Sequence, residues 1–118
     1  MTEGTGKDRI RMTVAEACTL GEAAMRGAGY DEDDARILTD HVVDAALCGY
    51  EYSGMAKLLN IPEHRRFKRP RYAMKVLRET EISTLYDGGN NVGMLVMYHA
   101  ARALRSTRRR PAGSRWWA

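Results

Sequence analysis

The chain has 118 residues, of which 44% are hydrophobic and 29% charged, as expected for one globular domain with a modest core. It contains no apolar run of the roughly 20 residues that a membrane helix needs, and residues 1–10 are too polar for a secretory signal. These features exclude a membrane protein, and we expect a cytoplasmic one in which the two cysteines, Cys18 and Cys48, are reduced and buried.

The N-terminal half predicts helices. Thr13 and Glu16 have the spacing of a capping box, so we expect a first helix from Val14 to about Gly27. Gly29 is placed for a left-handed helix stop. The side of this helix that we predict to be buried carries Val14, Cys18, Ala24 and Met25.

A second helix should have the acidic run 31–34 at its N-terminus, because negative charge is favoured there. It should reach about Cys48 and present a narrow face of small and aliphatic residues: Ala35, Leu38, Val42, Ala45, Ala46 and Gly49. A third, shorter helix is expected from Gly54 to Ile61, ending before Pro62.

The second half mixes strand and helix signals. After a basic linker, residues 74–78 and 82–86 read as two short strands joined at 79–81. Residues 87–91 form a strong turn signal, and a last helix should begin near Val92. This order predicts an α+β fold, with an N-terminal three-helix bundle followed by a two-strand element and a C-terminal helix.

Two segments resemble the type-2 malate/L-lactate dehydrogenase family. Residues 45–58, A-A-L-C-G-Y-E-Y-S-G-M-A-K-L, are similar to the family's A-D-L-R-G-V-D-S-H-G-V-A-R-L. Residues 84–93, T-L-Y-D-G-G-N-N-V-G, look like its A-V-L-D-G-D-x-G-x-G. The helix start from Gly29 to Ala35 also matches G-x-x-x-x-D-A, so the resemblance extends over roughly residues 13–104.

The resemblance implies a fragment of a larger α/β dehydrogenase that uses NAD or NADP on 2-oxo and 2-hydroxy acids. The family takes its acid/base histidine and its carboxylate-binding arginine from the first motif, and the equivalent positions here are Tyr52, Ser53 and Lys57. Ser53 stands at the histidine position and Lys57 at the arginine position. Because serine does not titrate near neutral pH and lysine lacks the bidentate fork, we expect the chain to be inactive alone. We also expect it to bind no cofactor, because the resemblance implies that the family's nicotinamide-binding domain lies mostly beyond the end of this chain.

The last residues, 105–118, are Arg-rich and end in Trp-Trp-Ala, unlike the helix that precedes them. One permitted coding of this stretch, read in another frame, gives A-I-D-K-A-K-A-G-G-F-A-L-V-G, which resembles a helix end, a glycine stop and a buried strand. We interpret residues 105–118 as a non-native basic tail that follows a one-base deletion after Leu104. The remaining organisation is a disordered tail (1–12), a helical domain (13–61), and a basic linker with the strand pair and helix (62–104).

Two other functions stay open on charge and surface grounds. Residues 1–61 carry 6 Lys/Arg and 11 Asp/Glu, a net charge of −5, whereas residues 62–118 carry 13 and 4, a net charge of +9. A small nucleic-acid-binding module could use the basic linker and tail, although the helices lack a basic recognition face, so solvated charge is the favoured interpretation. The chain could also be a dimerisation or interaction unit, and we expect a homo-oligomer. His41, His64 and His99 have no metal-ligand spacing, so no metal is expected.

Overall fold

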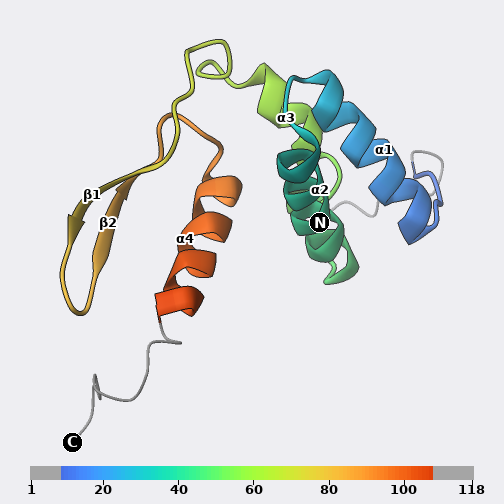
Figure 1. Ribbon diagram of the computed structural model, residues 1–118. Helices are drawn as coiled ribbons and strands as arrows, with labels where there is room; N and C mark the ends of the chain where they lie inside the picture. Colours follow the sequence, from blue (N-terminus) through green and yellow to red (C-terminus); the bar gives the residue numbers. More distant parts are fainter. Residues whose placement is uncertain (1–8, 108–118) are drawn as a thin grey trace, which may run out of the picture. The chain divides into compact units, whose positions relative to one another are not determined.

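The computed structural model describes residues 9–107, and it confirms the predicted mixed α+β class. Within that range the elements are α1 (Val14–Gly27), α2 (Glu32–Leu47), the 3-10 turn η1 (Glu51–Ser53), α3 (Lys57–Glu63), β1 (Lys75–Glu79), β2 (Thr84–Asp87) and α4 (Gly93–Thr107) (Figure 1). The chain divides between Leu59 and Asn60 into two compact units. Of the predicted tails 1–12 and 105–118, residues 1–8 and 108–118 lie outside the described residues. Residues 9–12 form no helix or strand, and residues 105–107 are the last residues of α4.

Helix α1 begins at the predicted capping box. The backbone N–H of Thr13 donates to Glu16 Oε2 at 2.7 Å, and the N–H of Glu16 donates to Thr13 Oγ1 at 3.1 Å. The hydrogen bonds from the Thr13 backbone and hydroxyl stabilise the charged carboxylate and hold the pKa of Glu16 below its usual value. Two backbone donors that helix formation leaves unpaired are thereby satisfied within four residues.

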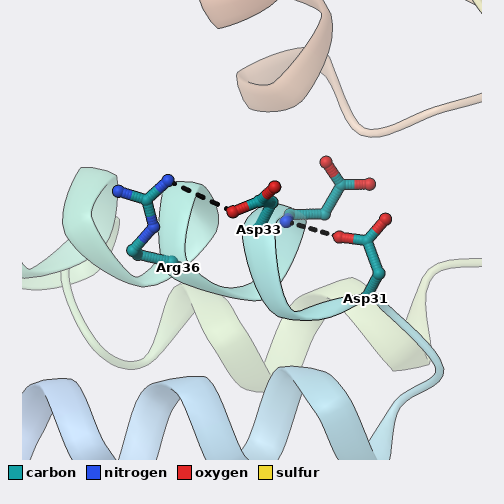
Figure 2. Close-up of polar contacts among 4 residues, drawn as sticks. Asp31, Asp33 and Arg36 are labelled. Carbon is teal, nitrogen blue, oxygen red and sulfur yellow. Dashed lines mark hydrogen bonds and ion pairs between the residues drawn. The ribbon is translucent and has the colours of Figure 1, made fainter.

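Helix α2 is capped by Asp31, whose Oδ1 accepts from the backbone N–H of Asp34 at 2.8 Å (Figure 2). Asp33 in the same first turn pairs with Arg36 at 3.4 Å. This ion pair is exposed and contributes little, but the acidic first turn itself opposes the positive end of the helix dipole. The prediction that the acidic run lies at the N-terminus of this helix is confirmed.

Helices α1 and α2 both end at a glycine in the left-handed conformation. Gly29 (φ 101°) and Gly49 (φ 89°) adopt the left-handed conformation after α1 and α2. In each case the next residue donates back to the helix, from Tyr30 to the Met25 carbonyl at 3.1 Å and from Tyr50 to the Ala45 carbonyl at 3.0 Å. This is the Schellman pattern, which pairs carbonyls that would otherwise be orphaned, and it confirms the predicted stop at Gly29.

The core of the first unit lies where α1 packs beside α2 (Figure 1). The buried stripe of α1 is Ala17, Gly21 and Met25, so the predicted face is wrong at Val14 and Ala24, which are exposed. The buried stripe includes Gly21 because a residue without a side chain lets α1 approach α2 closely. A Cβ on Gly21 would come within 2.6 Å of Thr39 Cγ2. On α2, Ala35, Leu38 and Val42 are buried as predicted, while Ala46 and Gly49 are exposed.

The third helix differs from the prediction. The chain first makes the turn η1, and α3 begins only at Lys57 and continues through Pro62 to Glu63. Proline costs a helix mainly through its missing N–H and its clash with the preceding turn. Here Pro62 is the sixth of seven residues, so α3 ends one residue after the proline and adds no further turn of backbone hydrogen bonds beyond it.

The second unit contains an antiparallel hairpin, β1–β2, with a bulge between Val76 and Arg78. The turn lies at residues 80–83, not 79–81, because the N–H of Thr80 donates to the Ser83 carbonyl at 2.8 Å and its hydroxyl accepts from the Ser83 N–H at 3.0 Å. The second strand therefore begins at Thr84 instead of Ile82. Every residue of β1 is exposed, whereas Leu95 of α4 is buried at 3% exposure.

Candidate functional site

The three family-equivalent positions lie close together along the chain after α2. Tyr52 and Ser53 belong to η1, and Lys57 is the first residue of α3. Tyr52 is 78% exposed, while Ser53 and Lys57 are half-buried. The structure therefore places all three in one short segment of the first unit.

This segment is fixed by backbone contacts. Gly54 is buried, and a Cβ on it would approach the Ala46 side chain to 2.9 Å, so glycine allows the chain to pass directly over α2. The Lys57 N–H donates to the Gly54 carbonyl at 2.9 Å, which starts α3. At the other end, Glu51 pairs with Arg9 at 2.9 Å, an exposed contact that contributes little stability.

The chemistry available at this segment is limited. Within residues 9–107, the side chains of Tyr52, Ser53 and Lys57 make no hydrogen bond or ion pair. Among the described residues, Ser53 consequently has no titrating partner that could activate its hydroxyl as a proton donor or nucleophile. Lys57 supplies one positive charge, which can attract an anionic group without the bidentate geometry of arginine.

A second cluster lies in the other unit, and the sequence pattern did not show how it is built. Residues 65–71, called here the basic segment, contain five cations: Arg65, Arg66, Lys68, Arg69 and Arg71. Asn90, in the turn after β2, has φ 62°. Its Nδ2 donates to three carbonyls of this segment, at 3.2 Å to Arg66, 3.3 Å to Pro70 and 3.5 Å to Arg69.

Further contacts hold the same segment. The Tyr72 N–H donates to the Gly89 carbonyl at 2.8 Å, and the Asn91 amide donates to the Tyr72 carbonyl at 2.7 Å. The Arg71 guanidinium lies 5.1 Å from the centroid of the Phe67 ring, in cation–π range. The sequence marked residues 87–91 only as a turn, and the tolerance of asparagine for the left-handed conformation was the one signal in it that pointed to Asn90.

The cysteine prediction needs correction. Both cysteines are free, but Cys18 is only half-buried and Cys48 is exposed. Cys48 caps the C-terminus of α2, where the chain turns away from the helix at Gly49 and leaves this position uncovered.

Residues 9–107 contain no group of three or more His, Cys, Asp or Glu side chains placed to hold a metal ion. None of the helices among them is long and apolar enough to cross a bilayer.

Comparisons with protein-family models, with curated proteins and with solved structures found no match.

Proposed function

We propose that this chain is a malate/L-lactate dehydrogenase-like polypeptide, corresponding to the N-terminal portion of that family, and that it does not turn over 2-oxo acids by itself. The order of the two motifs supports the relationship. The observation that carries the lack of activity is Ser53, a hydroxyl without a hydrogen-bonding or charged partner in the described range, at the position of the family's acid/base histidine.

The reaction explains why this position matters. Reduction of a 2-oxo acid requires a hydride from the nicotinamide and a proton delivered to the carbonyl oxygen. A positioned general acid contributes about 100- to 10,000-fold in rate, and histidine is suited to the task because it titrates near neutral pH. Ser53 cannot replace it without a neighbour that takes up and returns a proton.

The carboxylate of the substrate would be bound by Lys57. Lys57 is half-buried at the start of α3 and keeps the positive charge expected at the family's arginine position. A lysine ammonium binds a carboxylate as a point charge, so it selects planar acids less well than arginine does. We assign weak 2-oxo acid binding, and no NAD or NADP binding, to these residues.

The two unpaired cysteines fit a reducing compartment such as the cytoplasm.

The test is nicotinamide oxidation with pyruvate and oxaloacetate, measured on the purified chain and on Ser53→Ala. We expect neither protein to exceed buffer. Turnover by the wild-type chain that Ser53→Ala abolishes would overturn the proposal.

The family relationship has its own test. Ser53→His combined with Lys57→Arg restores both family side chains, and we expect about tenfold tighter 2-oxo acid binding by NMR titration, the effect of roughly one charge-assisted hydrogen bond. The matched control is Leu59→His with Leu20→Arg, which places the same residue types at exposed positions of the first unit. Equal affinity in both variants would contradict the assignment of these positions.

A further inference from the structure

The basic segment is more than a solvated charge run, because its cations are not neutralised. Arg65, Arg66, Lys68 and Arg69 are exposed, and their side chains make no ion pair or hydrogen bond within residues 9–107. The seven residues of the basic segment, 65–71, include no Asp or Glu that could neutralise these charges. Four uncompensated charges over five residues repel one another, a cost that binding of a polyanion would relieve.

The segment is also held in one conformation. The Asn90 amide gathers carbonyls from Arg66 to Pro70, and the N–H groups of Phe67 and Arg69 close successive turns onto the carbonyls of His64 at 2.8 Å and Arg66 at 3.1 Å. Fixing this backbone in the free protein removes part of the ordering cost that a flexible basic tail would meet on binding.

We propose that the basic segment, held by Asn90, binds the phosphate backbone of a single-stranded nucleic acid. Clustered Arg and Lys side chains bind such a backbone by displacing its condensed counterions. Tyr72 directly follows the segment in the chain and is 63% exposed, so its aromatic ring is accessible for a base to stack on.

The chemistry favours a single strand over the two other polyanionic surfaces. The cations lie in a series of turns and not on a helix or strand, so no element is formed to enter the major groove of a duplex. Residues 64–71 expose no large apolar side chain, and Phe67 lies half-buried against Arg71, so apart from the neighbouring Tyr72 the segment has no apolar side chain to insert into a membrane interface.

The decisive experiment compares two variants of equal charge on the full chain. One is Arg65→Gln/Arg66→Gln/Lys68→Gln/Arg69→Gln; the other makes the same four changes in the terminal tail, at Arg105, Arg108, Arg109 and Arg110. Both lower the formal net charge from +4 to 0. Binding is measured by fluorescence anisotropy of a labelled oligothymidine strand over a series of salt concentrations.

We expect the segment variant to bind at least tenfold more weakly and its log–log salt slope to fall by about 2.8, since each phosphate contact on a single strand contributes about 0.7. The tail variant should lose less than threefold. Because the four segment side chains are exposed and unpaired, their replacement should leave the circular dichroism spectrum and the melting temperature unchanged.

A third variant, Asn90→Ala, keeps the charge at +4 and removes the contacts that hold the segment, so we expect about threefold weaker binding. Equal losses in the segment and tail variants would overturn the proposal, because charge alone would then explain binding. Binding to vesicles containing phosphatidylserine but not to the oligonucleotide, or no binding to either, would overturn it as well.

Discussion

At the scale of single residues, the contact between Gly21 and Thr39 decides how closely α1 and α2 approach. Thr39 is fully buried, and its Oγ1 has no hydrogen-bond partner among the described residues. Its methyl group occupies the space that the missing side chain of Gly21 leaves open. A buried hydroxyl without a partner costs about 1–3 kcal/mol, so this site combines close packing with an unpaired polar group.

Thr39→Val should therefore stabilise the protein. Valine keeps the shape of threonine and removes the unpaired hydroxyl, and a gain of about 1 kcal/mol corresponds to a rise of roughly 4–8 °C in Tm for a domain of this size. The measurement is thermal unfolding followed by circular dichroism. Thr39→Ser is the control: it retains the hydroxyl and deletes the methyl against Gly21, so its Tm should fall. A lower Tm for Thr39→Val would show that the hydroxyl is satisfied in solution.

At the scale of elements, the turn from Asp87 to Asn91 organises the second unit. Gly89 has φ 62°, and a Cβ added to it would collide with the carbonyl oxygen of Tyr72. The Gly89 N–H donates to Asp87 Oδ1 at 2.9 Å, while its carbonyl accepts from Tyr72. One glycine thus joins the end of β2 to the strand-like chain that leaves the basic segment.

Gly89→Ala should loosen this turn. The left-handed conformation costs a non-glycine residue about 1–2 kcal/mol, and the displaced Tyr72 carbonyl adds to it. We expect hydrogen–deuterium exchange at the Tyr72 amide to accelerate about tenfold or more. Gly93→Ala is the matched control, since nothing lies within 4 Å of a Cβ there and its φ is not positive. Equal exchange in the two variants would contradict the role assigned to Gly89.

The sequence predicted those elements whose signals are local. Thr13, Asp31 and Gly29 mark helix ends through contacts within a few residues, so their pattern could be recognised without a partner. The buried face of α1 could not, because Gly21 is buried through its fit against Thr39 and Leu58, which are distant in the sequence. The same holds for Asn90, whose carbonyl partners lie 20–24 residues earlier in the chain. At the candidate site, the positions of Ser53 and Lys57 followed from a motif, but their lack of polar contacts did not.

At the scale of the whole molecule, the hairpin exposes much apolar surface. Leu77 is 61% exposed, Ile82 77% and Leu85 59%. A two-stranded hairpin is marginally stable in water unless its apolar face is covered. An uncovered edge and apolar face also invite pairing with another chain.

We expect the chain to self-associate through the hairpin. Size-exclusion chromatography with light scattering should show a dimer or larger species at high concentration, and Leu77→Lys/Ile82→Lys should shift it to the monomer. The control Leu20→Lys/Leu59→Lys adds the same two charges at exposed leucines of the first unit and should leave the association unchanged. A monomeric wild-type chain, or equal effects of both variants, would refute this prediction.

The left-handed glycines that end α1 and α2, Gly29 and Gly49, also affect how the first unit tolerates insertions. Each of its two long helices carries a start and an end in its own sequence, through a side-chain cap and a left-handed glycine. The length of α2 is consequently independent of whatever follows Tyr50. Residues inserted after that point would lengthen a connection, at a small entropic cost, and leave the number of helical turns as it is.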